Sequence, residues 1–304
     1  MLEPRWTYSN PLGLSKWYGH VDYHGRYVIG QWFALDAETG TQYWTRRFFR
    51  PTTVCGCAHG VIVASETRSD GPWTVGFGVY GIDAQTGNLR WVNHGRGLWG
   101  KLLRCFDYVP GFTNEFRDVP KCLVDQYVVT ERGRILDVRT GRDCPSVKFN
   151  EPNNDDRSGP PHKLYDNKSL ETDGDTIKVE GHHDDFVILR RDKNGNDVWR
   201  FAAKDSSLHV DGNYYSYRFH DGRIFFILGD APNSVPINEA KPLYVKANSA
   251  NYQLGILDIS SGECILHPLA SAMRRNECRI EAIRDSRMLV SCDGTELAEY
   301  EIAN

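Results

Sequence analysis

The sequence has no clustered excess of basic residues, which a dedicated nucleic-acid binder needs in order to neutralise phosphates. Its formal net charge is −4, and its densest basic positions are the pairs Arg46-Arg47 and Arg274-Arg275. No apolar run approaches the length that spans a membrane. We therefore expect neither nucleic acid nor a membrane among the partners of this chain.

The N-terminal stretch MLEPRWTYSN has no charged segment followed by an apolar one, so it does not resemble a secretory signal. The eight cysteines are scattered, mostly in strand-like runs, and no second pair accompanies Cys55-Gly56-Cys57 at metal-ligand spacing. We expect reduced, partly buried thiols in a cytoplasmic protein. A removed export signal would reopen that expectation.

Long stretches with the 3.6-residue apolar period of a helix are also missing, and short β-branched runs bounded by small turns take their place. Several of these runs follow a turn such as His24-Gly25, His59-Gly60 or Asp221-Gly222. We expect each to be the second strand of a β-sheet unit in an all-β chain. The six runs are 26–30, 60–66, 122–131, 175–181, 223–229 and 287–292.

A corner motif then repeats along the chain, most clearly in FALDAETGTQYW at 33–44 and VYGIDAQTGNLRW at 79–91. Glycine takes the positive φ of a tight corner at little cost, and Asp and Thr side chains bond the exposed groups of the turn. The Trp falls on the return strand and is large enough to bridge to the neighbouring unit. The repeat residues are Trp6, Asp36, Gly40, Trp44, Asp83, Gly87, Trp91, Asp137, Gly141, Gly195, Trp199, Asp258 and Gly262.

The two ends of the chain supply complementary strands. Residues 296–302 resemble the third strand of a unit that lacks its fourth, and residues 4–8 resemble a Trp-bearing fourth strand. Pairing them would close a ring of sheets and remove exposed edges. The sequence predicts a single β-propeller domain over 1–304 with six four-stranded blades. Seven blades are the alternative, if a long insertion hides a degenerate one.

The units resemble the quinoprotein-like, or PQQ-binding-like, β-propeller repeat A-x-D-x-x-T-G-x-x-x-W. The match is nearly complete at 34–44 and 82–91 and partial at 135–141, 189–199 and 255–262. The resemblance implies a tryptophan girdle, a set of indoles docked between neighbouring blades, formed by Trp44, Trp91, Trp199 and Trp6.

Quinone-dependent enzymes of that family carry an adjacent Cys-Cys pair beside the cofactor, together with Glu, Asn and Asp ligands to calcium. This chain has no adjacent Cys-Cys pair, and it is shorter than those enzymes. The resemblance therefore implies a non-catalytic member without a cofactor, of the kind that scaffolds protein assembly.

Four longer segments carry the functional prediction: 66–78, 93–120, 147–168 and 230–252. With blade strands lettered a to d outward from the ring axis, all four are b–c or d–a connections and fall on one face. Loops on a rigid scaffold often carry recognition, and aromatic residues are enriched at interfaces. The partner-binding candidates are Trp73, Trp99, Phe112, Phe116, Tyr165 and Tyr244, and the same segments hold Phe106, Tyr108 and Tyr252.

We predict a non-enzymatic scaffold that binds another protein through this face. The aromatic residues could instead simply anchor their own loops. The main alternative function is a hydrolase- or lyase-type enzyme with its active site in the axial funnel of the same face. A quinone-dependent dehydrogenase is the least favoured.

The most metal-like cluster is His182, His183, Asp184 and Asp185. Neighbouring residues of a strand or tight turn point apart, so we favour a solvated turn over a metal site. The segment 192–197 lacks the remote Glu of a calcium loop and fits a degenerate blade corner. No G-x-S-x-G or H-E-x-x-H motif occurs, and we assign no catalytic residue.

Overall fold

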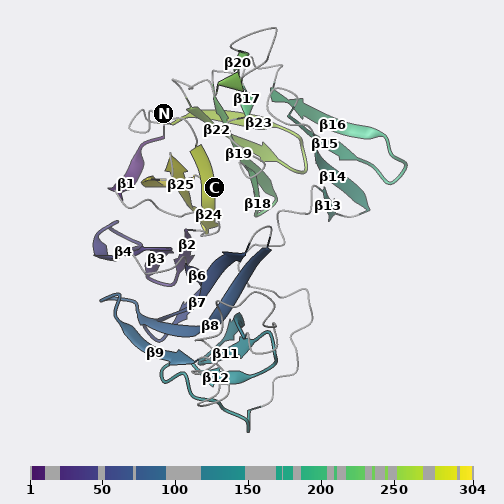
Figure 1. Ribbon diagram of the computed structural model, residues 1–304. Coiled ribbons are helices and arrows are strands. Elements are labelled where there is room, and N and C mark those ends of the chain that lie inside the picture. The colour runs from purple at the N-terminus through teal and green to yellow at the C-terminus, as the bar shows by residue number, and fades with distance from the viewer. Residues whose placement is uncertain are drawn as a thin grey trace. The chain divides into compact units, whose positions relative to one another are not determined.

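The computed structural model is all-β and divides into two compact units (Figure 1). Unit 1 combines Met1–Pro11 with Lys163–Asn304, and unit 2 is Leu12–His162. The described ranges contain no α-helix, and so none that is long and apolar enough to cross a membrane. The structure describes residues 2–10, 21–46, 52–70, 73–93, 118–147, 169–172, 174–180, 186–203, 209–210, 217–229, 235–236, 244–245, 252–269, 278–292 and 295–302.

Unit 2 contains three antiparallel sheets, with the strand orders β2-β3-β4-β5, β6-β7-β8-β9 and β10-β11-β12. Each sheet is a meander in which successive strands are hydrogen-bonded neighbours. The strands are β2 (Asp22–His24), β3 (Tyr27–Gly30), β4 (Phe33–Asp36), β5 (Gln42–Thr45), β6 (Thr52–Ala58), β7 (Val61–Asp70), β8 (Trp73–Asp83), β9 (Leu89–Asn93), β10 (Pro120–Val124), β11 (Tyr127–Thr130) and β12 (Ile135–Asp137).

Unit 1 contains the sheets β13-β14-β15-β16, β17-β19-β22-β23 with β18 also paired to β19, β24-β25-β26-β1, and the hairpin β20-β21. Its strands are β1 (Pro4–Ser9), β13 (Ser169–Thr172), β14 (Asp175–Glu180), β15 (Val187–Arg191), β16 (Asp197–Ala202), β17 (His209–Val210), β18 (Tyr217–His220), β19 (Arg223–Gly229), β20 (Val235–Pro236), β21 (Tyr244–Val245), β22 (Tyr252–Asp258), β23 (Cys264–Pro268), β24 (Cys278–Arg284), β25 (Arg287–Cys292) and β26 (Glu296–Glu301).

All six predicted second strands are present, as β3, β7, β11, β14, β19 and β25. The run 122–131 is not one strand, however. It breaks at Asp125, whose φ of 52° makes the turn between β10 and β11. The third sheet also has three strands instead of four, and an isolated bridge between Leu136 and Asp143 lies where a fourth would pair.

The N-terminal strand completes the last sheet, as predicted. β1 pairs antiparallel with β26 from Pro4 opposite Tyr300 to Ser9 opposite Glu296. Trp6 is buried on this strand. Arg5 donates to the fully buried carboxylate of Glu299 at 2.6 Å, which supplies the partner that a buried charge requires.

The cores lie between consecutive sheets, because each sheet presents apolar residues on both faces. In unit 2 one cluster joins Ile29 and Trp44 of the first sheet to Ile62 and Ala84 of the second. In unit 1 the corresponding clusters join β14 and β15 to β19 and β22, and β19 and β22 to β24, β25 and β26. Face-to-face packing of sheets in chain order is the arrangement that the repeat predicts.

Both short turns of a sheet lie at the same end of that sheet. In the first sheet the amide of Ala37, just after β4, donates to the carbonyl of Arg26 in the β2–β3 turn at 2.9 Å. Ala84, Val138, Ile259 and Ile302 make the equivalent bond in four other sheets. We call this the corner end. The b–c and d–a connections leave from the opposite, open end, as the register of the repeat predicts.

Cys278 and Cys292 lie opposite each other on β24 and β25 and form a disulfide, with their Cα atoms 4.4 Å apart. Both are buried in the core of unit 1. The expectation of reduced thiols is therefore wrong for this pair. The disulfide depends on which residues face each other across two strands, and the spacing of cysteines along the chain does not reveal that. Five other described cysteines are half-buried thiols: Cys55, Cys57, Cys122, Cys144 and Cys264.

Candidate protein-binding surface

The corner aspartates are used by their own turns. Asp83 Oδ1 accepts the amides of Gln85 at 3.0 Å and Thr86 at 2.8 Å, and the same two-amide pattern recurs at Asp36 and Asp258. Asp137 Oδ1 accepts the amide and the hydroxyl of Thr140. At Asp258 the hydroxyl of Ser260 and the amide of Ser261 lower the carboxyl pKa to about 2. These carboxylates therefore hold the corner in shape, as the sequence predicts.

The degenerate fourth corner works in the same way although its Asp is displaced. Asp192 Oδ1 accepts the amides of Asn194 at 2.8 Å and Asn196 at 2.9 Å, and Gly195 has a φ of 85°. These bonds lower the pKa of the Asp192 carboxyl, with the Asn196 side chain the largest cause. Residues 192–196 therefore form the turn between β15 and β16, the place that the repeat gives them.

Three tryptophans bridge neighbouring sheets. The indole N–H donates to a backbone carbonyl of the next sheet from Trp44 to Ala84 at 2.9 Å, from Trp91 to Val138 at 2.8 Å and from Trp199 to Ile259 at 3.1 Å. The three rings lie against Gly87, Gly141 and Gly262, where a Cβ would come within 2.7, 2.4 and 2.4 Å of the indole. These three indoles therefore pack between neighbouring sheets, whereas the docking of Trp6 stays a prediction.

A second set of bonds between sheets went unpredicted. Arg46 Nη1 donates to the carbonyl of Gly87 at 3.3 Å, and Asn93 Nδ2 donates to the carbonyl of Gly141 at 2.7 Å. Arg190 similarly reaches the carbonyls of Ile259 and Ser260. The signal for the first two was their shared position, six residues after a corner glycine. These bonds join neighbouring sheets, so the groups that make them serve the fold.

At the open end of unit 2, β7 and β8 continue past both neighbouring strands (Figure 1). The β6 strand begins with Thr52 opposite Glu66, and β9 ends with Asn93 opposite Val79. Residues 67–70 and 73–77, which we call the arm, pair with each other beyond those points. The prediction of an irregular loop at 66–78 is wrong, because residues 66–70 and 73–77 pair as strands. The Gly71-Pro72 dipeptide indicates a turn but does not show how far the strands on either side extend.

A β-bulge lies at the base of the arm. Ala64 faces Tyr80 while Glu66 faces Phe77, so β8 carries one extra residue there. Gly78 has a φ of 66° at this point, a conformation that glycine adopts without the penalty of a Cβ. Bulges of this kind bend a strand and increase its twist, so the bulge marks the point where the arm departs from the rest of the sheet.

The aromatic candidates have different outcomes. Trp73 begins β8 opposite Asp70, and Tyr244 begins β21 opposite Pro236, so the segment 230–252 contains a hairpin and is not wholly irregular. Tyr252 is 5 % exposed in the core of unit 1, so its assignment to the loop surface is wrong. The remaining candidates lie outside the described residues, and so do the metal candidates: Trp99, Phe106, Tyr108, Phe112, Phe116, Tyr165, His182, His183, Asp184 and Asp185.

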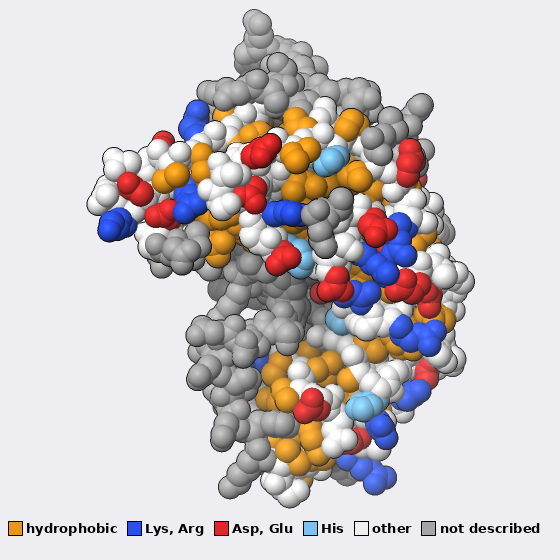
Figure 2. Space-filling model, turned by 180° about the vertical axis from the view of Figure 1, so that it is seen from behind, with side chains coloured by type: hydrophobic (Ala, Val, Ile, Leu, Met, Phe, Trp, Pro, Cys, Tyr) orange, Lys and Arg blue, Asp and Glu red, His pale blue; other side chains and the backbone are white. Residues whose placement is uncertain are grey.

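Other reactive side chains in unit 2 belong to the packing. Burial raises the pKa of the Cys55 and Cys57 thiols to about 12 and lowers the pKa of His24 to about 4. All three are therefore uncharged at neutral pH. Within the described ranges no three His, Cys, Asp or Glu residues are placed to hold a metal ion. Figure 2 shows basic and acidic side chains interspersed over one face, without separation by sign.

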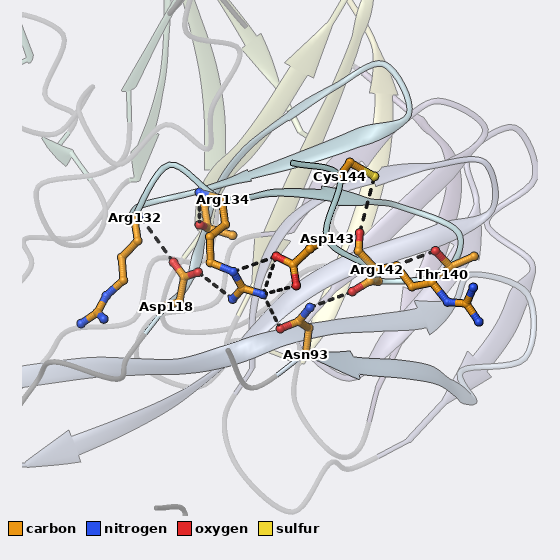
Figure 3. A network of polar contacts seen from close by, with 10 residues as sticks. Asn93, Asp118, Arg132, Arg134, Thr140, Arg142, Asp143 and Cys144 are labelled. Carbon is orange, nitrogen blue, oxygen red and sulfur yellow. Dashed lines mark hydrogen bonds and ion pairs between the residues drawn. The ribbon is translucent and has the colours of Figure 1, made fainter. Parts of the chain in front are cut away.

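A network of polar contacts centres on Arg134, which begins the segment leading into β12 (Figure 3). Its Nη1 donates to Asp118 at 3.0 Å, its Nη2 to Asn93 at 2.9 Å, and its Nε and Nη2 to the two oxygens of Asp143 at 2.9 Å. The amide of Arg132 adds a bond to Asp118 at 3.3 Å. No sequence pattern indicated this network, because its members are far apart along the chain.

No protein-family model matches the chain, and no curated protein matches its sequence. Similar solved structures include BamB from Moraxella catarrhalis, at 13 % identity over 93 % of this chain and 84 % of that one, with a TM-score of 0.30. The Dos1 propeller matches at 11 % identity over 100 % and 96 %, with a TM-score of 0.36. The AfRom2 CNH domain matches at 10 % identity over 92 % and 77 %, with a TM-score of 0.26. Our assignments therefore rest on the sheets and contacts of this chain.

Proposed function

We propose that this chain is a single six-bladed β-propeller and a non-enzymatic scaffold that binds another protein at the open ends of its blades. Support for the ring comes from the repeated sheets, the indoles between them and the N-terminal strand that completes the last sheet. The corner ends carry the bonds that hold turns and sheets together. The open ends carry the long connections, which leaves recognition to that side.

The observation that carries the proposal is the arm. Side-chain positions alternate between the faces of a strand, so Trp73, Val75 and Phe77 share one face of the arm by register. Thr74 and Gly76 share the other face. The apolar row has a bulky aromatic residue at each end and β-branched Val75 between them, a composition suited to the anchoring residues of a protein interface.

The absence of charged residues favours the β8 strand of the arm over the β7 strand as the edge that contacts a partner. Residues 73–77 of β8 contain neither a charge nor a proline, whereas 67–70 of β7 contain Arg68 and Asp70. Charged residues on an edge strand oppose the addition of another strand. A partner segment in extended conformation would therefore add to the β8 edge, through backbone bonds and alternate side chains.

Charge on the apolar face disfavours face-to-face stacking of the arm with a second copy of this chain. Glu66, Arg68 and Asp70 lie opposite Phe77, Val75 and Trp73 in the register. Antiparallel stacking of two arms centred on Arg68 would set Arg68 against its counterpart and Glu66 against Asp70. Like charges would meet at every position, which disfavours the pairing. A different protein, with a basic residue at each end of an apolar row, fits this pattern.

Affinity capture from native lysate with matched variants tests the proposal. Trp73→Ala and Phe77→Asp change the apolar row, and the uncharged substitutions Ser69→Ala and Thr74→Ala change the opposite row of the same arm. We expect the first pair to weaken binding of the captured protein by about thirtyfold, since anchoring residues contribute about 2 kcal/mol. The second pair should bind as the wild type does. Equal losses from both rows, or none from either, would show that the arm is not the binding surface.

A further inference from the structure

We infer that the outer edge of β9 is a second docking surface, which takes an extended, acidic segment of another protein. The surface, which we call the rim site, consists of Tyr80, Leu89 and Val92 on one face of the sheet, with Arg46 beside them. It uses no residue of the arm and goes beyond the function proposed above. The free edge of β9, its exposed apolar side chains and an unmatched positive charge carry the inference.

The pairing register of β8 and β9 assembles the rim site. Tyr80 lies opposite Val92, and Ile82 lies opposite Leu89. Directly paired residues lie on the same side of a sheet, and residues two apart on one strand share a face, so all four side chains are on one face. Ile82 is buried in the cluster that packs against the first sheet. The other three residues continue this apolar face outward to β9, the last strand of the sheet.

The two apolar side chains of β9 are exposed to solvent. Leu89 is 53 % exposed and Val92 is 37 % exposed. The described residues include five large apolar side chains with such exposure, and β9, with only five residues, carries two of them. Removing apolar side chains from water is the main favourable contribution to protein association. A partner strand that covers this face would therefore gain the contribution that the chain itself leaves unused.

The edge of β9 also lacks the usual protection against strand addition. Its one charged residue, Arg90, is turned back onto Asp83 of the same sheet, with its Nε 2.9 Å from the carboxylate, and it contains no proline. By contrast, β1 begins at Pro4, β23 ends at Pro268 and β16 carries the exposed Arg200. The outer strand β5 has neither a charge nor a proline, but it exposes no large apolar side chain. Charges and prolines oppose the addition of a strand, so β9 is the outer strand best suited to receive one.

Arg46 gives the rim site its charge preference. It follows β5, and its Nη1 reaches the corner just before β9, 3.3 Å from the carbonyl of Gly87 and 3.1 Å from Oδ1 of Asn88. Both acceptors are neutral, and no carboxylate of the described ranges bonds this guanidinium. Complementary charge favours the right partner and like charge excludes the wrong one. The segment that fits therefore has apolar residues for Leu89 and Val92 and a Glu or Asp near Arg46.

Selection from a displayed library of random twelve-residue peptides, with the full chain immobilised, tests the class of ligand. We expect the enriched peptides to have apolar residues at alternate positions and to contain Glu or Asp. Synthetic copies of them, labelled for fluorescence anisotropy, then report affinity. Failure to enrich any peptide, or enrichment of peptides without an acidic residue, would overturn the inference.

Matched serine variants test the apolar face. We expect Leu89→Ser combined with Val92→Ser to weaken binding of the selected peptides at least tenfold. Val198→Ser and Ile265→Ser are the controls, because each replaces a β-branched residue that is more than half exposed on an outer strand of unit 1. Both controls should bind as the wild type does. Equal weakening in the controls and the β9 variant would overturn the inference.

Arg46 variants separate the effect of charge from that of structure. Peptides in which Gln replaces the acidic residue should bind the wild type at least fivefold more weakly than the selected peptides. Arg46→Gln should bind the two forms alike, and Arg46→Lys should keep the preference because it keeps the charge. A loss of structure would weaken both forms equally and leave the preference unchanged. An unchanged preference in Arg46→Gln would therefore overturn the inference.

The rim site and the arm can fail separately. Selected peptides that lose affinity for the Trp73→Ala and Phe77→Asp variants, but not for the β9 variant, would belong to the arm and would overturn the rim site. Sedimentation equilibrium tests the other possible occupant, a second copy of this chain. Self-association that disappears when Leu89 and Val92 are changed to serine would identify that copy as the occupant and would likewise overturn the inference.

Discussion

At the scale of single residues, the chain uses its polar side chains mainly to hold turns and to join sheets. The corner aspartates accept amides of their own turn, and Arg46, Asn93 and Arg190 reach carbonyls of the next sheet. The buried charge of Glu299 has Arg5, and that of Asp118 has Arg134. These polar groups are therefore already engaged by the turns and sheets that they join.

Asp258 gives a prediction at this scale. Its folded pKa is about 2, below the ordinary value of 3.8, because the turn donates to the ionised carboxylate. A lowered pKa contributes stability above the unfolded value, and that contribution is lost as the pH falls from about 4 toward 2. We expect Asp258→Asn to be less stable than the wild type at pH 7, with the difference shrinking below about pH 4 and nearly gone at about pH 2. Urea unfolding at a series of pH values measures it, and a difference independent of pH would contradict it.

The sequence patterns predicted contacts between residues that are close along the chain and missed contacts between residues that are far apart. The corner could be predicted because Asp83, Gly87 and Trp91 are near one another in the chain and each has one evident physical task. The Arg134 network could not, because Asp118 and Asn93 lie 16 and 41 residues away and only the folded sheets bring them together. The assignment of Tyr252 to a surface loop is wrong because composition does not show the residue at which a strand begins.

At the scale of elements, the β7–β8 hairpin shows how a strong turn signal can mislead. Gly71-Pro72 and the glycines at 76 and 78 indicate a loop, yet the apolar residues Trp73, Val75 and Phe77 occupy alternate positions of this run. That alternation is the mark of a strand, and the structure pairs Asp70 with Trp73 to form it. The bulge at Gly78 then separates the arm from the four-stranded part of the sheet.

The disulfide between β24 and β25 gives a prediction for an element. It joins residues 14 apart, and closing a loop of about 15 residues stabilises a fold by about 3 kcal/mol. We expect reduction to destabilise unit 1 by about that amount, and we expect Cys278→Ala with Cys292→Ala to abolish the effect of reductant. Urea unfolding with and without dithiothreitol measures it.

The same pair tests the cytoplasmic location, which stays a prediction. Reducing compartments keep such pairs as thiols. Rapid alkylation in cells followed by mass spectrometry should find Cys278 and Cys292 reduced if that location is right. A fully oxidised pair would contradict it.

At the scale of the whole molecule, the repeat gives each sheet a corner end and an open end. Each sheet closes its corner end with short turns tied by backbone bonds, such as Ala37 to Arg26. The variable connections leave from the open end, where the arm and the Arg134 network lie. Insertions at that end would leave the sheets intact, because loop length costs little in closure entropy.

Hydrogen exchange of the chain with and without the captured partner tests the central claim most directly. Binding at the open end predicts slower exchange in 66–77 and 94–117, with the corner turns at 36–40 and 83–87 unchanged. Protection confined to the corner turns, with the arm exchanging as fast as in the unbound chain, would contradict it.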